Sequence, residues 1–166
     1  MEDGQLSFTA LTAAAARAAH LIVDQEPWIF ADGLAAQLLG EQAEELISYH
    51  KLHGTHPVLA GARVQVTCRS RYTEDALSRA VSRGVGQYVI LGAGLDSFAY
   101  RAGLAGRVRV FEVDHPASES VARSTATNVT ASGTGTWAAA SARRFQSWVA
   151  GWSTSNTRTR PARPAR

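Results

Sequence analysis

The sequence predicts an α/β fold in which a helical N-terminal region precedes a small parallel sheet. A short apolar run, 88–91, leads into the turn Gly92-Ala93-Gly94. A second apolar run, 108–113, carries Glu112 and is followed by Asp114, about twenty residues after the turn. A glycine-rich turn after one buried strand, with an acid at the end of the next, is the layout of a nucleotide-type cofactor site at the edge of a parallel sheet.

Length and composition are those of one globular domain with a real core. The chain has 166 residues, 45% of them hydrophobic, and Cys68 is its only cysteine. No internal disulfide is therefore possible, and a reducing compartment is the natural expectation. The N-terminus carries acids where a secretory signal needs positive charge, and charged residues interrupt the only long Ala-rich stretch. We expect a cytoplasmic protein that does not associate with membranes.

The net charge of +3 is unevenly distributed along the chain. Residues 121–166 contain seven Arg and no acid, whereas all 14 acidic residues lie within 1–120. A basic tail of this kind can bind nucleic acid by releasing phosphate counterions. It lacks, however, the aromatic interleaving or the helical pattern of a dedicated module, so we expect no specific nucleic-acid partner. The composition of 121–166 predicts a largely irregular or disordered segment.

The first 85 residues predict a series of helices. Apolar spacing and Ala content indicate helical segments over 6–21, 30–40, 41–52 and 73–84. Gly40 stands where the C-cap of the second helix is expected. Thr73 precedes two acids, which is typical of the first turn of a helix. The segment 58–68 is expected to be helical, although its Val-rich end also fits a strand.

The pattern changes to that of a β-α-β unit from Gly86 onward. The continuous β-branched run 88–91 predicts a strand buried on both faces of a parallel sheet, and 108–113 predicts the next strand. The segment 96–102 between them is expected to begin a helix, whose dipole would stabilise an anionic group at the glycine turn by about 1 kcal/mol. Pro116 stands where a further helix could start.

Glu112 and Asp114 are both candidates for binding the two hydroxyl groups of a ribose. Their spacing by two places both side chains on the same face of a strand. Asp114 is favoured because it is nearer to the strand end, where ligands bind. Each charge-assisted hydrogen bond of this kind contributes about 1.5–3 kcal/mol. Ser97 stands where dinucleotide-binding proteins have Gly or Ala, which weakens the alternative of a nicotinamide-dependent oxidoreductase.

Five segments together resemble a known family. They are AAAAR at 13–17, DQEPWIFADGLAAQLLG at 24–40, RSRYTED at 69–75, QYVILGAGLDSFAYR at 87–101 and FEVDHP at 111–116. In order and spacing the chain resembles the S-adenosylmethionine-dependent methyltransferases related to the leucine carboxyl methyltransferases, especially a bacterial O-methyltransferase group. The resemblance covers about residues 8–120.

The resemblance implies an incomplete Rossmann-like class I methyltransferase fold with an N-terminal helical cap. Residues 1–85 would form the cap and cofactor lid, 86–120 the first β-α-β unit, and 121–166 a tail unrelated to the family. The implied cofactor is S-adenosyl-L-methionine, and the implied partner is a small-molecule methyl acceptor with a carboxylate or hydroxyl oxygen. Such an enzyme mainly positions the nucleophilic oxygen in line with the sulfonium methyl group.

The resemblance also implies where the cofactor binds. Its methionine part would lie over the glycine turn, with Arg71 or Arg69 pairing its carboxylate and Asp114 holding the ribose. The implied cofactor-binding residues are Arg69, Arg71, Gly92, Ala93, Gly94, Asp96, Glu112 and Asp114. The sequence identifies neither a catalytic base nor a metal site.

The resemblance stops after Ser120, where relatives continue with a helix rich in Lys, Arg and Leu. Our hypothesis is that 121–166 is a frame-shifted or otherwise replaced C-terminus, which leaves about half of a methyltransferase. A Leu- and Asp-containing continuation in another frame of the gene would support it. Because two strands cannot bury both faces of a large sheet, we expect the isolated chain to be poorly stable and inactive. A non-catalytic remnant is the alternative function.

Overall fold

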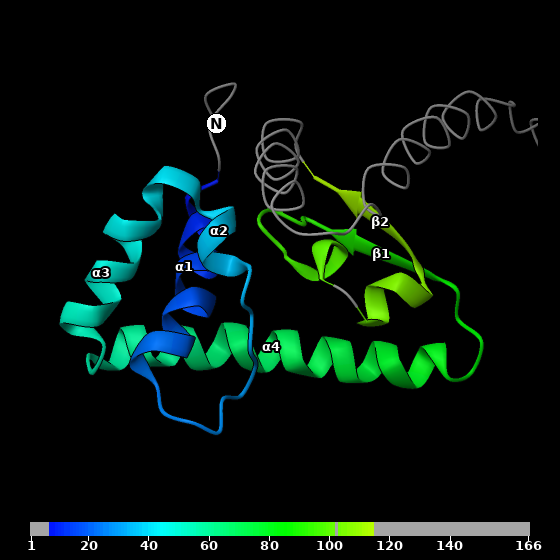
Figure 1. Ribbon diagram of the computed structural model, residues 1–166, viewed down its shortest axis with the longest axis horizontal. Helices are drawn as coiled ribbons and strands as arrows, with labels where there is room; N and C mark the ends of the chain where they lie inside the picture. Colours follow the sequence, from blue (N-terminus) through cyan, green and yellow to red (C-terminus); the bar gives the residue numbers. More distant parts are fainter. Residues whose placement is uncertain (1–6, 102, 115–166) are drawn as a thin grey trace, which may run out of the picture.

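The computed structural model describes residues 7–101 and 103–114. Figure 1 shows α1, α2 and α3 gathered at one end, the sheet at the other, and α4 running beneath both. The described elements are, in order, α1 (Phe8–Val23), α2 (Ala35–Leu38), the 3-10 turn η1 (Gly40–Gln42), α3 (Ala43–His53), α4 (Pro57–Val81), β1 (Gln87–Leu91), the 3-10 turns η2 (Phe98–Tyr100) and η3 (Gly103–Arg107), and β2 (Arg109–Val113). The described chain is thus mixed α/β, with helices preceding a two-stranded parallel sheet.

The helix α1 is the centre of the helical end and confirms the first predicted helix. It packs against α2, α3 and α4. Leu11, Ala14, Ala15 and Ala18 recur at helical spacing and are buried in the main apolar cluster. Because most of these side chains are methyl groups, neighbouring backbones can approach α1 closely.

The helix α4 is a single element of 25 residues. Pro57 suits its first turn, and the side chain of His56 caps it by accepting the Val58 N–H at 3.3 Å. The prediction of a helix start at Thr73 is wrong, and 58–68 is helical rather than a strand. Helix-forming residues continue across the predicted break, where Arg71 and Asp75 pair one turn apart at 2.9 Å.

The second predicted helix, 30–40, is reduced to the four residues of α2. Asp32 explains the difference. Its carboxylate accepts the Leu34 N–H at 3.2 Å and the Arg17 Nε–H at 2.9 Å, and these bonds favour a non-helical backbone before Ala35. Gly40, the predicted C-cap, has the expected left-handed conformation with φ of 57°.

The strands β1 and β2 pair in parallel, with Val89 opposite Phe111 and Leu91 opposite Val113. The α-helix predicted over 96–102 is wrong, because the described part of the connection contains only η2 and η3. The Asp96 side chain accepts the Phe98 N–H at 2.7 Å, a local bond that competes with helix formation. The predicted helix-dipole stabilisation of an anion at the glycine turn therefore does not apply.

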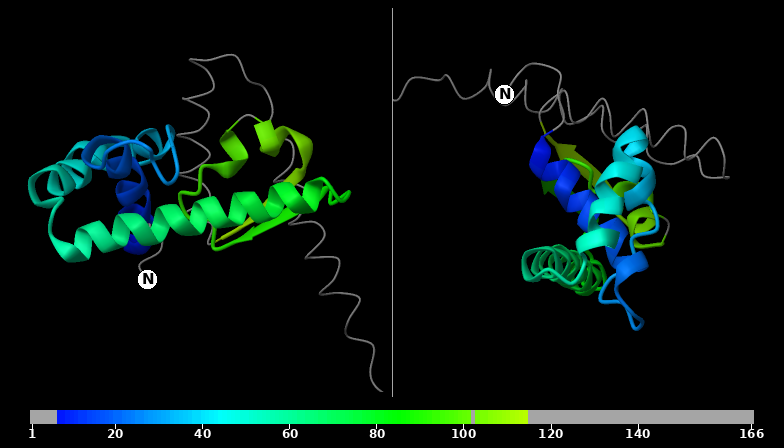
Figure 2. Two further views of the ribbon diagram at one scale, coloured as in Figure 1. Left: turned by 90° about the horizontal axis from the view of Figure 1, so that it is seen from below. Right: turned by 90° about the vertical axis from the view of Figure 1, so that its left-hand side faces the viewer.

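One face of the sheet is covered within the described residues. Tyr88, Ile90 and Val110 belong to a cluster with Leu77 of α4 and Phe98 of η2, and Figure 2 shows the C-terminal half of α4 alongside the strands. On the opposite face, Val89 is 44% exposed and Leu91 is 76% exposed. The prediction that β1 is buried on both faces is therefore wrong, because the described chain supplies a helical layer on one face only.

Some predictions fall outside the described residues. They are the helix start at Pro116 and the irregular character of 121–166. Within 7–101 and 103–114, no helix combines the length and the apolar character needed to cross a bilayer.

Candidate functional site

A cavity of about 560 Å³ lies at the carboxyl ends of β1 and β2, where α1 and α4 meet the sheet. This edge is where ligands bind in parallel α/β sheets. Six of the eight predicted site residues line the cavity: Arg69, Gly92, Ala93, Gly94, Asp96 and Asp114. The structure thus brings a cation of α4, the glycine turn after β1 and the acid after β2 around one space.

The two glycines of the turn serve different purposes. Both have left-handed backbones, with φ of 65° at Gly92 and 55° at Gly94. A Cβ added at Gly92 would meet nothing within 4 Å, so the backbone there is open to a ligand. A Cβ added at Gly94 would lie 2.9 Å from the Cβ of Ala10 in α1. Gly92 therefore leaves room beside the cavity, whereas Gly94 lets the helical region approach the turn.

Asp114 lies immediately after β2 and is joined to the glycine turn. Its Oδ2 accepts a hydrogen bond from the backbone N–H of Gly94. The bond holds the carboxylate at the cavity wall, where it is partly buried. This is the position in which an acid after the second strand can accept hydrogen bonds from ligand hydroxyl groups.

Glu112, the other acid, lies outside the cavity lining. It accepts a hydrogen bond from the Tyr100 hydroxyl at 3.1 Å. The spacing of Glu112 and Asp114 predicts that both lie on one strand face, but β2 ends at Val113. The alternation of side chains therefore does not extend to Asp114, and the structure favours Asp114 over Glu112.

Arg69 and Arg71 of α4 are also distinguished by the structure. Arg71 pairs with Asp75 at 2.9 Å, its side chain is 59% exposed, and it does not line the cavity. Arg69 lines the cavity, and no ion pair is found for it within the described part of the chain. The geometry favours Arg69 as the cation that faces a bound anionic group.

A buried polar cluster beneath the turn was not predicted. Asp32 accepts hydrogen bonds at Oδ2 from Arg17 Nε at 2.9 Å and from the Ser97 hydroxyl at 2.7 Å. Arg17 also donates to the carbonyl oxygen of Leu95 at 2.6 Å. The available signal was Arg17 itself, a charged residue at a core position of an Ala-rich helix. An ion on a buried helix face is expected to have a partner.

Arg101 extends this cluster to α4. Its Nε donates to the Ser97 hydroxyl at 3.0 Å, and its guanidinium forms an ion pair with Glu74. The guanidinium also lies 5.0 Å from the centre of the Phe30 ring, within the range of a cation–π contact. Arg101 therefore connects the turn to both the helical region and α4.

Tyr88 contributes a hydroxyl-bearing ring to the cavity wall. Burial raises its pKa, and the negative charges of Asp96 and Glu74 raise it further. The phenol therefore stays protonated at neutral pH and can donate a hydrogen bond. Its ring packs edge-on against Phe98, with 5.1 Å between ring centres.

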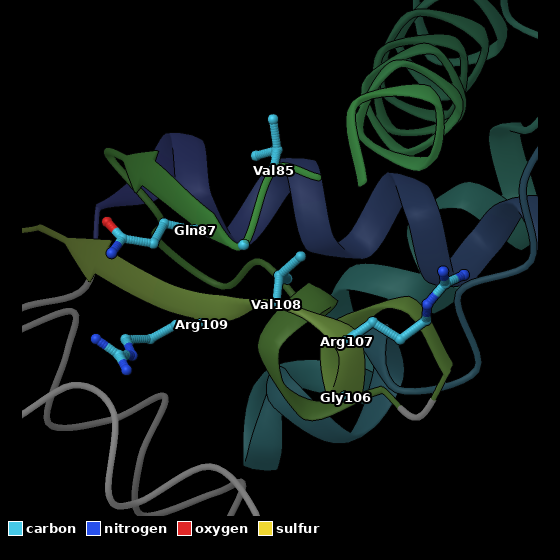
Figure 3. Close-up of a pocket in the computed structure, with 7 residues that line it drawn as sticks. Val85, Gln87, Gly106, Arg107, Val108 and Arg109 are labelled. Atoms are coloured by element: carbon cyan, nitrogen blue, oxygen red, sulfur yellow. The ribbon is translucent and has the colours of Figure 1, made fainter. Parts of the chain in front are cut away.

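A second hollow, of about 670 Å³, lies at the opposite ends of the strands. Val85, Gln87 and the segment 106–109 line it, and Figure 3 shows Arg107 and Arg109 pointing away from one another. Its polar groups do not converge on one point. Across the described ranges, no three His, Cys, Asp or Glu side chains are grouped so that they could hold a metal ion. The cavity beside the glycine turn is therefore the candidate site.

Comparison with known proteins identifies the family. The family model for leucine carboxyl methyltransferase matches residues 10–145, which reaches into the segment 121–166. YktD of Bacillus subtilis, whose name assigns it to the S-adenosyl-L-methionine-dependent methyltransferases, is 34% identical over 142 residues. That alignment covers 73% of this chain and 46% of YktD.

A similarly named protein of Mycobacterium marinum is 32% identical over 122 residues, which cover 68% of this chain and 38% of that protein. Another from Frankia alni is 45% identical over 51 residues, or 31% of this chain and 18% of the relative. The chain thus spans less than half the length of these relatives. The match to the family model covers most of the chain, and the chain belongs to the leucine carboxyl methyltransferase family.

Proposed function

We propose that the cavity beside the glycine turn binds S-adenosyl-L-methionine, and that the chain forms the cofactor-binding part of an O-methyltransferase. One observation carries the proposal: the open backbone at Gly92 and the carboxylate of Asp114 line the same cavity at the carboxyl ends of two parallel strands. Family membership and the names of the relatives support the same cofactor. The small sheet would be the beginning of a Rossmann-like class I fold, with 8–81 as its helical cap.

The residues present fit this cofactor. The methionine part would pass over the turn at Gly92, where an added Cβ would meet no atom within 4 Å. Arg69 would pair with its carboxylate, and Asp114 would accept hydrogen bonds from the ribose hydroxyls. When bound, the cofactor supplies the electrophilic methyl group. The protein's task is to fix the position of that group relative to the acceptor oxygen.

The proposed acceptor is a small molecule with a carboxylate or hydroxyl oxygen. The family's description as a carboxyl methyltransferase supports an oxygen nucleophile. None of the cavity residues is proposed as a catalytic base. Tyr88 stays protonated, so its role there would be that of a hydrogen-bond donor.

We further propose that the isolated chain binds the cofactor weakly and does not turn it over. Leu91, which lines the cavity, is 76% exposed, so the described residues leave that side of the cavity open to water. Desolvation strengthens polar contacts with a ligand, and an open site loses part of this gain. The expected dissociation constant is therefore millimolar rather than micromolar.

An NMR titration of the full chain tests the proposal. S-adenosylhomocysteine is expected to shift amide signals of the glycine turn and of Asp114, whereas NAD⁺ at the same concentrations is not. Asp114→Ala provides the control, since it removes the acceptor for the ribose. Equal shifts with NAD⁺, or none with either ligand, would reject an adenosyl-methionine site.

A further inference from the structure

We infer that Ser97 and Asp32 are positioning residues: they fix the glycine turn in its ligand-binding shape without contacting the ligand. The inference rests on the proposed function for its effect on cofactor affinity. Its structural part concerns the ligand-free protein and stands independently. Neither residue is among the cofactor-binding residues predicted from the sequence.

Both side chains are deeply buried. Asp32 is 1% exposed and Ser97 is 2% exposed, although both lie in the wall of the cavity. A carboxylate buried this deeply is costly unless hydrogen bonds and a counter-charge compensate for lost hydration. Such an arrangement persists only where several partners hold it, so the group is a rigid anchor within the site.

The polar atoms of both side chains already form hydrogen bonds within the protein. Asp32 accepts from the Leu34 N–H at Oδ1, and from Arg17 and Ser97 at Oδ2. The Ser97 hydroxyl donates its single proton to Asp32 and accepts from Arg101 at 3.0 Å. The Ser97 hydroxyl therefore has no proton left to offer a ligand, and the Asp32 oxygens are surrounded by protein donors. Asp32 and Ser97 can therefore affect a ligand only by holding the backbone of the turn in position.

Asp32 and Ser97 hold the backbone immediately after the glycine turn. Arg17, oriented by Asp32, donates to the Leu95 carbonyl, one residue after Gly94. Ser97 anchors the chain two residues further on. The intervening backbone is held by local bonds, from the Asp96 N–H to the Ala93 carbonyl and from the Phe98 N–H to Asp96. The turn is thus attached to α1 and to the segment before α2 at two adjacent points.

This arrangement also gives a reason for serine at position 97. An alanine or glycine, the residues of dinucleotide-binding turns, could neither donate to Asp32 nor accept from Arg101. The hydroxyl joins two charged groups that come from distant parts of the chain. Removing it separates the Arg17–Asp32 pair from the Arg101–Glu74 pair while changing the side-chain volume very little.

The test compares two buried hydroxyl groups. Ser97→Ala removes the one that anchors the turn. Thr67→Val removes the hydroxyl of Thr67, which is 0% exposed in α4 and donates within its own helix to the Arg63 carbonyl at 2.7 Å. Ser97→Thr restores the hydroxyl and serves as a rescue. A second comparison, with a larger expected effect, uses Asp32→Asn. Its matched control is Asp24→Asn, which alters the separate Arg63–Asp24 pair.

Hydrogen exchange of the ligand-free full chain is the primary measurement. Amides of 92–98 are expected to exchange about three- to tenfold faster in Ser97→Ala, because each lost bond lowers the local opening free energy. They should keep wild-type rates in Thr67→Val and Ser97→Thr. Unchanged exchange in Ser97→Ala, or equal acceleration in Thr67→Val, would overturn the positioning role.

Affinity for S-adenosylhomocysteine is the second measurement. Ser97→Ala should raise the dissociation constant about three- to tenfold, and Thr67→Val should leave it within twofold. Faster exchange with unchanged affinity would show that Ser97 has no role in ligand binding. If the wild-type chain binds no S-adenosylhomocysteine while exchange differs as expected, the proposed function fails and the positioning of the turn stands.

Discussion

The Cβ position of Gly94 lies 2.9 Å from the Cβ of Ala10, so the first turn of α1 rests on the glycine turn that follows β1. This contact joins the helical end of the molecule to the sheet at the point where the candidate site is built. The site is therefore composite: its floor comes from the sheet, and α1 and α4 supply its walls. Anything that separates α1 from the turn should affect folding and ligand binding together.

The two glycines offer a direct test of this contact. Gly94→Ala should destabilise the chain by about 2–5 kcal/mol, because a left-handed backbone costs a non-glycine residue about 1–2 kcal/mol and overpacking against Ala10 costs about 1–3 kcal/mol. Gly92→Ala should cost only the backbone part, about 1–2 kcal/mol. Urea denaturation of both variants measures the difference. A loss at Gly92 as large as that at Gly94 would contradict the role of the Ala10 contact.

Asp114 should show separate effects on stability and on binding. Asp114→Asn keeps an oxygen that can accept the Gly94 N–H, so the melting temperature should change little. It removes the negative charge and one acceptor, so affinity for S-adenosylhomocysteine should fall about tenfold or more. Asp114→Ala should lower both quantities. Calorimetric melting combined with an NMR titration distinguishes the variants, and an Asn variant that binds like the wild type would exclude Asp114 as the ribose acceptor.

Arg69 and Arg71 of α4 allow a matched test of which arginine binds the carboxylate of the ligand. Arg69→Gln should weaken binding of S-adenosylhomocysteine about tenfold or more, since a charge-assisted hydrogen bond contributes about 1.5–3 kcal/mol. Arg71→Gln breaks an exposed pair with Asp75, which contributes about 0–1 kcal/mol to stability, and should change affinity less than twofold. Titration of both variants gives the comparison. The reverse order would assign the role to Arg71.

Much of the fold follows from local sequence patterns. The Ala-rich period of α1, the left-handed Gly40 and the apolar runs of β1 and β2 are local signals, and each element occurs where its signal lies. The failures at α2 and at 96–102 share one cause. In each, a side chain forms a bond that a pattern of apolar residues does not reveal: Asp32 with Arg17, and Asp96 with the Phe98 N–H. At Thr73 the prediction is wrong because helix-forming residues continue through α4 without a break.

The candidate site, like the fold, could be predicted from the sequence only in part. The glycine turn and Asp114 were predicted because their spacing along the chain is itself the signal. The choice between Arg69 and Arg71 depends on helix phase relative to the sheet, which only the packed structure supplies. The side-chain partners of Asp32, Arg17 and Ser97, lie 15 and 65 residues away, so a short window of sequence around Asp32 does not reveal them.

Acid should destabilise the helical region around His50. This side chain is buried in α3, and burial lowers its pKa below the usual 6.5, with the positive charge of Arg63 acting in the same direction and Asp24 opposing it. Above pH 6.5 the imidazole is neutral in both folded and unfolded chains and does not affect stability. As the pH falls below that value, the unfolded chain binds a proton that the folded chain resists, so stability decreases until the folded pKa is passed.

The melting temperature should therefore fall as the pH is lowered from about 8 to about 5. His50→Gln should flatten this profile in the region where His titrates. His53→Gln, at an exposed position of the same helix, is the control and should leave the slope unchanged. A slope that persists in His50→Gln would place the acid sensitivity in another group.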